Sequence, residues 1–417
     1  MANTNPTSRL YMPAKAALPA LQRYRILAVF AVIASILVTA SCRKSPEEII
    51  AKLQTRISEL PLDAEDRQDE IEDMLSEIDE YENRENEKHV QVLAEQLNQP
   101  FFAQSADGQV LAIYTGKEWF IVNPTGTNRF NDGKRPDSFV ISANGRYIVY
   151  TVPVSETKCK LSRIDLGEHR SGSDFKDNFT EELCTTSIAA HDDGSVYFTR
   201  NTGVIQYSFK DNGYRLVIND SFYKPKYPKL GYKIFLASAP DALWLLFGAA
   251  GDYDLYQYSG NINQARKIYP AVASPHMQLS APALFAEDSQ NTDASVTPTT
   301  EPLLFFYTGE AGRYSLQGFT TNGTLAKAFQ LPIHKDLIYL TQSNEFLYVK
   351  DGYPVRFSTA TGSENRLPIK VSRFFVHNQS LIMIDPKNRL LQRNDPYTEF
   401  EKKLFQIKEE LESILRQ

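Results

Sequence analysis

Residues 142–150 read SANGRYIVY, a polar turn followed at once by an apolar strand. Residues 105–114 repeat the pattern as SADGQVLAIY, and Asp192-Asp193-Gly194 precedes a third such strand. Asn-Gly and Asp-Gly are strong hairpin signals, because both residues of a tight hairpin turn need positive φ. The recurrence of turn and strand predicts a fold built from repeated antiparallel sheets.

The β-rich pattern extends over residues 99–395 and divides into seven units of roughly 35–50 residues, the period expected of a propeller with one four-stranded sheet per blade. Six or eight blades stay open, because the fifth and seventh units are degenerate. Residues 287–301 (EDSQNTDASVTPTTE) are polar and rich in Ser and Thr, so we expect a disordered insertion there. The predicted fold class is mainly β, a seven-bladed β-propeller flanked by helices.

The repeat at residues 142–150, followed by LSRIDL at residues 161–166, resembles the repeat of TolB-like and WD40-like propellers. The proline common in that turn is absent, and the chain has no Trp-Asp dipeptide. The resemblance implies the fold and leaves function open, because propellers carry many functions.

The N-terminal region resembles the signal peptide of a bacterial lipoprotein. Arg23 and Arg25 precede an apolar run, residues 26–40, that is shorter than the roughly 20 residues of a membrane-spanning helix. The run leads into Thr39-Ala40-Ser41-Cys42, which resembles a lipobox with Thr39 in place of the usual leucine. We therefore expect residues 1–41 to be removed and Cys42 to carry lipid. The alternative is that residues 26–41 stay as an uncleaved anchor.

Both alternatives place residues 43–417 outside the cytoplasm. The resemblance to lipoproteins implies a bacterial outer membrane, because the residue after Cys42 is arginine and not the aspartate of inner-membrane retention.

Residues 42–98 predict a helical, acidic stalk resembling a coiled coil. Apolar residues recur at helical spacing, Pro61 interrupts them, and a bent helical hairpin fits as well as an oligomeric coiled coil. The acidic stretch 59–87 is either a solvated face or a docking surface for a basic partner. Residues 396–417 predict an amphipathic helix that begins at Asp395-Pro396 and packs on the stalk.

The three cysteines are too few for a disulfide framework or a cysteine-rich zinc site. If Cys42 carries lipid, Cys159 and Cys184 remain as a pair on neighbouring predicted strands of one blade. An oxidising compartment would allow them to form a disulfide, and two buried thiols are the alternative.

Motifs of catalysis and metal binding are missing from the sequence. The six histidines show no metal-ligand spacing, and no nucleophile elbow, P-loop or zinc-protease motif occurs. His191-Asp192-Asp193 is the most polar cluster, yet it is better interpreted as a hairpin turn. The aromatic loop 221–228 (SFYKPKYP) could pack between blades or form a partner-binding rim.

The net charge is −6, and loss of the four basic residues of 1–41 would leave −10, which argues against nucleic acid as a partner. We therefore expect a non-catalytic scaffold without cofactor or metal. It would be anchored by lipid and bind a protein of the cell envelope, and it could form homo-oligomers through its helices. The alternative is a propeller that binds carbohydrate or a small ligand, or a hydrolase whose site leaves no motif.

Overall fold

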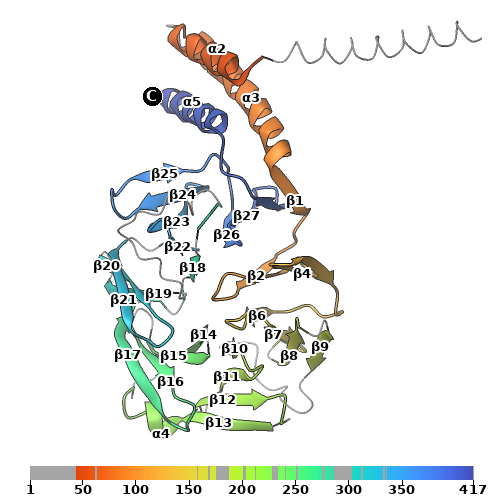
Figure 1. Ribbon diagram of the computed structural model, residues 1–417, viewed down its shortest axis with the longest axis vertical. Helices are drawn as coiled ribbons and strands as arrows, with labels where there is room; N and C mark the ends of the chain where they lie inside the picture. The colour runs from red at the N-terminus through yellow and green to blue at the C-terminus, as the bar shows by residue number, and fades with distance from the viewer. Residues whose placement is uncertain are drawn as a thin grey trace, which may run out of the picture. The chain divides into compact units, whose positions relative to one another are not determined.

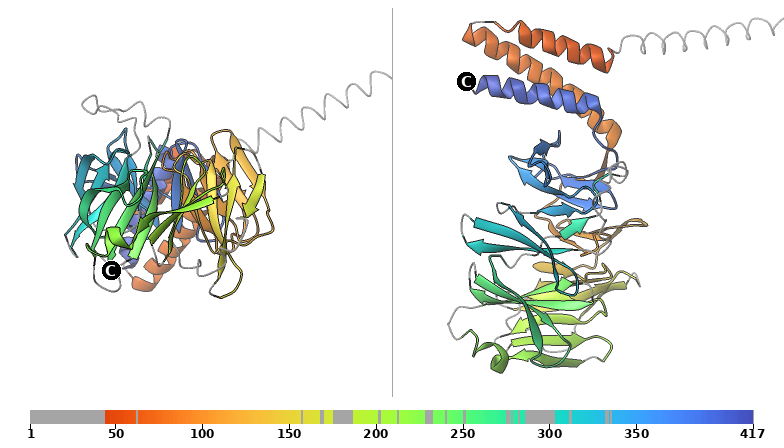
Figure 2. Two further views of the ribbon diagram at one scale, coloured as in Figure 1. Left: turned by 90° about the horizontal axis from the view of Figure 1, so that it is seen from below. Right: turned by 60° about the vertical axis from the view of Figure 1, so that its left-hand side comes forward.

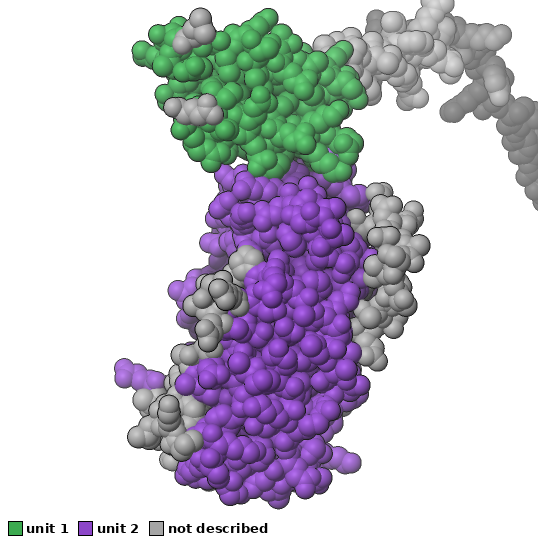
Figure 3. Space-filling view, turned by 90° about the vertical axis from the view of Figure 1, so that its left-hand side faces the viewer, with its two compact units in different colours: residues 1–82, 399–417 green, residues 83–398 purple. Residues whose placement is uncertain are grey.

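The computed structural model describes residues 44–416 except 62, 157, 168–169, 175–186, 201–202, 212, 228–232, 240, 250–251, 275–276, 278, 282, 286–302, 311–312, 332–333 and 335. The chain divides into two compact units (Figure 3). One contains residues 1–82 and 399–417, and the other contains residues 83–398. Each unit is described by itself below.

The larger unit is a ring of antiparallel sheets (Figure 1). Blades 1 to 4 each consist of four strands in chain order. Blade 1 holds β2 (Phe101–Gln104), β3 (Leu111–Tyr114), β4 (Trp119–Asn123) and β5 (Gly126–Phe130), and blade 2 holds β6 (Ser138–Ile141), β7 (Tyr147–Pro153), β8 (Cys159–Asp165) and β9 (Arg170–Asp174). Blade 3 holds β10 (Ile188–Ala190), β11 (Val196–Arg200), β12 (Gly203–Ser208) and β13 (Gly213–Asn219), and blade 4 holds β14 (Lys233–Ala239), β15 (Ala242–Ala249), β16 (Asp252–Tyr258) and β17 (Ala265–Val272). A one-turn helix, α4 (Asp220–Tyr223), connects blades 3 and 4.

Blades 5 to 7 are less regular. Blade 5 holds β19 (Leu304–Glu310), β20 (Arg313–Phe319) and β21 (Leu325–Gln330), blade 6 holds β22 (Ile338–Leu340), β23 (Glu345–Lys350), β24 (Tyr353–Ser358) and β25 (Glu364–Arg366), and blade 7 holds β26 (Arg373–His377), β27 (Ser380–Ile384) and β28 (Leu390–Arg393). The short strand β18 (Leu279–Ala281) pairs in parallel with β22. Among the described residues, blade 5 therefore has three strands, and its β19 also pairs with β17 of blade 4 through Val272 and Thr308.

Seven hydrophobic clusters join successive blades around the ring, among the residues that the structure describes. The cluster between blades 1 and 2 contains the fully buried Trp119, which meets Phe139 and Tyr150 edge to face. Equivalent clusters join blades 2 and 3, 3 and 4, 4 and 5, 5 and 6, 6 and 7, and 7 and 1. The prediction of a seven-bladed propeller is thus confirmed.

The ring closes through β1 (Val90–Ala94), which pairs with β28 as the outer strand of blade 7. The prediction of a helical stalk over residues 42–98 is therefore wrong at its C-terminal end, because the helix ends at His89. Leu93 is buried in the cluster between blades 7 and 1. Valine, which occupies positions 90 and 92, is a residue that favours strands. The N–H and C=O groups of this segment form their hydrogen bonds with β28 instead of within a helix.

The smaller unit has one hydrophobic core shared by α2 (Pro46–Ser58), the part of α3 (Ala64–His89) up to residue 82, and α5 (Glu399–Leu415). Leu53, Met74 and Leu404 are fully buried in this core. Ser45 and Glu48 form a capping box that begins α2, and the break before α3 contains Pro61. The C-terminal helix α5 thus packs against the helical hairpin that α2 and α3 form (Figure 2).

Acidic residues of α3 pair with basic residues of the two other helices. Arg56 of α2 contacts Glu70, Asp73 and Glu77, and Lys408 of α5 contacts Asp79 at 2.5 Å. A part of the acidic stretch is therefore neutralised within the unit. In the part of the chain that the structure describes, no helix is both long and apolar enough to cross a bilayer. Residues 26–42, on which the anchor prediction rests, lie outside that part.

Candidate functional site

The Ser-Ala-Asx-Gly repeats form the turn between the first two strands of a blade. In blade 1 the buried Ser105 hydroxyl accepts from the Val110 N–H at 2.9 Å, and Ser142 does the same for Tyr147 in blade 2. Only the glycine of each turn has positive φ, +71° at Gly108, so the turn is type I followed by a left-handed residue. The expectation of positive φ at both turn residues is wrong, and the motif acts as a structural turn.

His191 replaces the serine of this turn in blade 3. Its Nδ1 lies 3.0 Å from Oδ1 of Asp193, which also accepts from the Ser195 N–H at 2.7 Å. The contact with Asp193 raises the pKa of His191 above its ordinary value and lowers the pKa of Asp193. The interpretation of this cluster as a hairpin turn is confirmed, because the Gly194 N–H donates to the His191 carbonyl at 2.9 Å.

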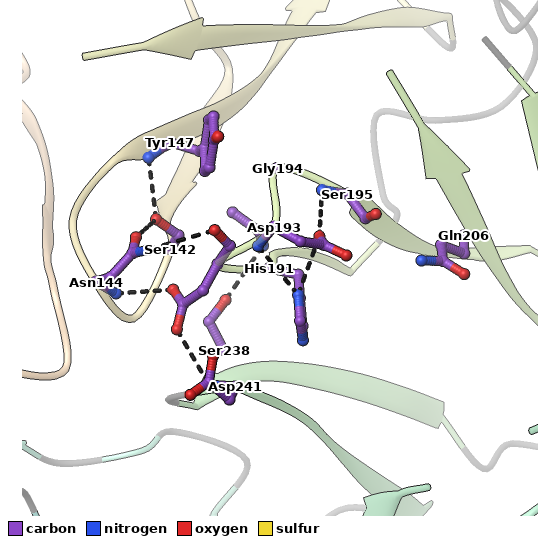
Figure 4. Close-up of polar contacts among 12 residues, drawn as sticks. Ser142, Asn144, Tyr147, His191, Asp193, Gly194, Ser195, Gln206, Ser238 and Asp241 are labelled. Atoms are coloured by element: carbon purple, nitrogen blue, oxygen red, sulfur yellow. Dashed lines mark hydrogen bonds and ion pairs between the residues drawn. The ribbon is translucent and has the colours of Figure 1, made fainter. Parts of the chain in front are cut away.

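Asp192 connects three blades through their turns. Its carboxylate accepts from the Asn144 N–H of blade 2 at 2.8 Å and from the Asp241 N–H of blade 4 at 3.1 Å. Figure 4 shows Asn144 and Asp241 on either side of the turn of blade 3. These hydrogen bonds join the turns of blades 2, 3 and 4 and fix their positions relative to one another.

A groove of about 820 Å³ opens between blades 2 and 3. Strand β8 and the first residues of β7 supply one side, and the turn from β12 to β13 supplies the other. Its lining residues are mostly charged or aromatic: Arg146, Tyr147, Arg163, Asp165, Asp193, Ser195, Gln206, Ser208, Phe209, Lys210, Asp211, Gly213, Tyr214 and Arg215.

Two ion pairs fix the carboxylates of this groove. Arg146 donates two hydrogen bonds of 3.1 Å to Asp165. Burial opposes ionisation of Asp165, but the hydrogen bonds from Arg146 and the Gly167 N–H outweigh it, so the pKa of Asp165 is lowered. Asp193 is held by His191 as described. Both carboxylates therefore stay ionised at neutral pH.

Arg163 forms part of the groove wall. Its Nη1 donates to the Gly194 carbonyl at 2.9 Å, and its guanidinium lies 3.8 Å from the centre of the Phe209 ring and 5.0 Å from that of Tyr147. Such cation–π contacts hold the side chain in one orientation. The groove thus has a rigid wall next to its exposed end at β13.

Exposed apolar side chains gather along the outer edge of blade 3. Tyr214 is 62% exposed and Leu216 is 36% exposed on β13, and Ile262 is 57% exposed in the turn after β16. That turn lies against β13, because the Asn263 N–H donates to the Val217 carbonyl at 2.8 Å. We call Tyr214, Arg215, Leu216 and Ile262 the edge patch.

Sequence reasoning missed the groove and the edge patch. One signal was present, since Tyr214 and Leu216 have apolar character on one side of β13 while Val217 and Ile218 are buried. A β-bulge between Val204 and Ile205 changes the register there. The residue pattern shows that the alternation of exposed and buried positions is interrupted along β13. It does not show which of these side chains face solvent.

The aromatic loop 221–228 packs inward as far as the structure describes it. Phe222, Tyr223 and Tyr227 surround Phe247, and the Tyr227 ring stacks on it at 5.9 Å. Of its two interpretations, packing between blades is the one that the structure supports.

The histidines are dispersed, and the described residues contain no group of three potential metal ligands. His377 of blade 7 donates through Nε2 to the Gln109 carbonyl of blade 1 at 2.7 Å. Burial lowers the pKa of His377, and the bond to Gln109 opposes this only in part. His89, His191 and His334 lie apart from it in other elements, and His169 and His276 lie outside the described residues.

The cysteine predictions are not decided. Cys159 is buried at the start of β8, whereas Cys184 and Cys42 lie outside the described residues. Their disulfide and the lipidation of Cys42 stay predictions, and so does the disordered insertion 287–301.

No protein-family model matches this chain, and no curated protein matches its sequence. Similar solved structures include TolB from Acinetobacter baumannii, with 15% identity, a TM-score of 0.33 and coverage of 55% of this chain and 54% of that one. BamB from Moraxella catarrhalis has 10% identity, a TM-score of 0.36 and coverage of 72% and 83%. A chain of a mitotic checkpoint complex has 10% identity, a TM-score of 0.42 and coverage of 74% and 94%. These likenesses concern the fold alone, and this chain spans about half the length of TolB.

Proposed function

We propose that this protein is a lipid-anchored, extracytoplasmic scaffold that binds another protein of the cell envelope through blade 3. The observation that carries the proposal is the edge patch. Interfaces favour tyrosine and arginine, and a few such residues supply most of the binding energy. Tyr214 and Leu216 are exposed on one side of β13, Arg215 lies between them in the strand, and the turn that holds the exposed Ile262 is bonded to β13 through Asn263.

The chemistry of the groove supports a non-catalytic role. A glycoside hydrolase needs one carboxyl group with a raised pKa as general acid and a second that stays ionised. In this groove both Asp165 and Asp193 have lowered pKa values, so neither is a proton donor at neutral pH.

Hydrophobic packing between turns of blades 1, 2 and 4 also supports the proposal that the partner binds at the outer surface of the ring. Ala106 and Ala143, from the turns of blades 1 and 2, belong to the same hydrophobic cluster as Ala237 and Ala239 of blade 4. Small apolar residues thus meet across this part of the ring. These four alanines close this part of the ring with hydrophobic contacts, and the carboxylate beside them, that of Asp192, already accepts from the backbone of blades 2 and 4.

The proposal is tested by affinity purification of the full chain from detergent-solubilised membranes. We compare the unaltered protein with Tyr214→Ser/Leu216→Ser and with a control, Leu325→Ser. Leu325 is 47% exposed on β21, the outer strand of blade 5, and is therefore a matched position. Neither exposed change should affect folding by more than about 0.5 kcal/mol per site.

We expect one partner to be recovered with the unaltered protein and the control, and at least about tenfold less with the double variant, which corresponds to about 1.4 kcal/mol. Equal recovery with all three proteins would refute the edge patch as the binding surface. Recovery of no partner, together with binding on a glycan array, would favour the carbohydrate-binding alternative.

The anchor is tested separately. Incorporation of labelled palmitate that is lost in Cys42→Ser, with release of the protein from membranes, is expected of a lipoprotein. Retention of the unlabelled variant in the membrane would instead support an uncleaved anchor at residues 26–41. A thiol count on the unreduced protein tests the Cys159–Cys184 pair.

A further inference from the structure

We propose that the groove between blades 2 and 3 binds an acidic segment of the partner protein, with Arg215 and Lys210 as the cations that receive its carboxylates. This inference rests on the proposed function and names the chemistry of the partner. The groove adjoins the edge patch, since Tyr214 and Arg215 belong to both. A segment seated on the patch would therefore extend into the groove.

The groove holds cations whose charge the protein leaves available. Arg215 donates to Gln206 Oε1 at 2.7 Å and to the Gly260 carbonyl at 3.4 Å, both of which are neutral acceptors. Lys210 is exposed in the turn after β12, and it makes no ion pair with any residue that the structure describes.

Unlike these two cations, most carboxylates of the groove already have a cationic partner. Asp165 is paired with Arg146, and Asp193 is paired with His191. Asp211 accepts a hydrogen bond of 2.9 Å from the Ser208 hydroxyl and is the remaining carboxylate without a cationic partner in the described part of the chain. Two available cations thus stand against one available anion, and the local charge is positive on a protein whose net charge is −6.

The two cations differ in what they can recognise. The planar guanidinium of Arg215 can hold a carboxylate through two parallel hydrogen bonds, whereas the ammonium of Lys210 acts as a mobile point charge. Gln206 of the neighbouring strand β12 orients the Arg215 side chain. Because Arg215 is already ordered, it loses less conformational entropy when the partner binds. Glutamate or aspartate side chains of an extended segment fit this arrangement.

The inference is tested with the full chain in detergent micelles and three fluorescent ten-residue peptides. The peptides carry glutamate, glutamine or lysine at alternate positions and are otherwise identical. We expect the glutamate peptide to bind at least about tenfold more tightly than the glutamine peptide, and the lysine peptide to bind least. The preference should weaken as salt increases, because exposed charge pairs are screened.

The variant Lys210→Glu/Arg215→Glu should abolish the preference for glutamate. The control Lys387→Glu/Arg416→Glu changes the net charge equally at exposed positions outside the groove, and it should retain the preference. Equal affinity for the glutamate and glutamine peptides would overturn the inference. Equal loss in the control would overturn it too, because the preference would then reflect net charge alone.

The outcomes separate the two proposals. Loss of the partner in Tyr214→Ser/Leu216→Ser without any peptide preference would leave the scaffold function and refute the acidic segment. Unchanged recovery of the partner in that variant would refute the edge patch, whatever the peptides show.

Discussion

Val90 lies directly opposite Arg393 in the pairing of β1 with β28, so the first strand of the propeller is the neighbour of its last. The ring is therefore closed by hydrogen bonds between segments about 300 residues apart, a long-range pairing whose loop closure costs entropy before any contact stabilises it. Stability of the propeller should depend strongly on this one strand.

Leu93→Ala should destabilise the propeller, because Leu93 is buried between blades 7 and 1. We expect a loss of about 2–4 kcal/mol in the free energy of unfolding, the usual cost of such a truncation in a core. Val92→Ala, at a position 44% exposed on the same strand, should change it by less than about 0.5 kcal/mol. Denaturant titration followed by tryptophan fluorescence measures both. Similar values for the two variants would contradict the closure described here.

Arg393→Met should also destabilise blade 7. Arg393 is fully buried, its guanidinium donates to the carbonyls of Asp395 at 2.9 Å and Pro396 at 3.1 Å, and it lies 3.9 Å from the centre of the Tyr397 ring. Methionine would leave two carbonyls without these donors, at a cost of about 2–3 kcal/mol. Thermal unfolding would show the loss. Arg366→Met, where the arginine pairs with the 68% exposed side chain of Asp351, should cost less than about 1 kcal/mol.

Asp192→Ala should loosen the register of three neighbouring turns. The carboxylate accepts from backbone N–H groups of blades 2 and 4, and its loss should cost about 1–2 kcal/mol, reduced from the buried value by its partial exposure. Asp192→Asn keeps one acceptor oxygen and should lose less. Amide hydrogen exchange at Asn144 and Asp241 is the direct readout. Exchange no faster than in the control Asp252→Ala would show that the bridge contributes nothing.

His377 should make stability fall in mild acid. Burial lowers its pKa in the folded protein below the unfolded value of about 6.5, while Asp107 and the bond to Gln109 act in the opposite direction. Its contribution is therefore fully present above pH of about 6.5 and is lost as the pH falls, because the unfolded chain takes up the proton more readily. His377→Gln should flatten this part of the stability profile. An unchanged slope would contradict it.

His191 should act in the opposite sense. Its contact with Asp193 raises its folded pKa, so its contribution is fully present below pH of about 6.5 and is lost as the pH rises through the raised value. His191→Gln should therefore lower stability in mild acid and have little effect in mild alkali. Urea titrations at both pH values measure the difference, and an equal effect at both would rule out the ion pair.

Much of the fold could be predicted from sequence, because it depends on local signals. Turns such as Ser142-Ala143-Asn144-Gly145 mark each blade, and the spacing of Leu404, Ile407 and Leu411 marks a helix with one buried face. The end of α3 at His89 could not be predicted. Residues 90–97 continue a helical spacing, and pairing with the distant β28 makes residues 90–94 of this segment a strand.

The candidate site was hidden for a related reason. The groove combines Arg146 of blade 2 with Arg215 of blade 3, and their proximity follows from the packing of two blades. The bulge beside Val217 lets the successive residues Val217 and Ile218 both be buried, which breaks the alternation along β13 in a way that the residue pattern does not reveal. Conversely, the polar cluster at His191 was visible in the sequence and proved to be a turn.

The pairing of Val90 with Arg393 also determines how the protein would carry a mechanical load. The chain enters β1 and leaves β28 at the same end of one antiparallel pair, so separating these two connections would open the pair one hydrogen bond at a time. Helix α3, which precedes β1, and helix α5, which follows β28, share one hydrophobic core within the smaller unit.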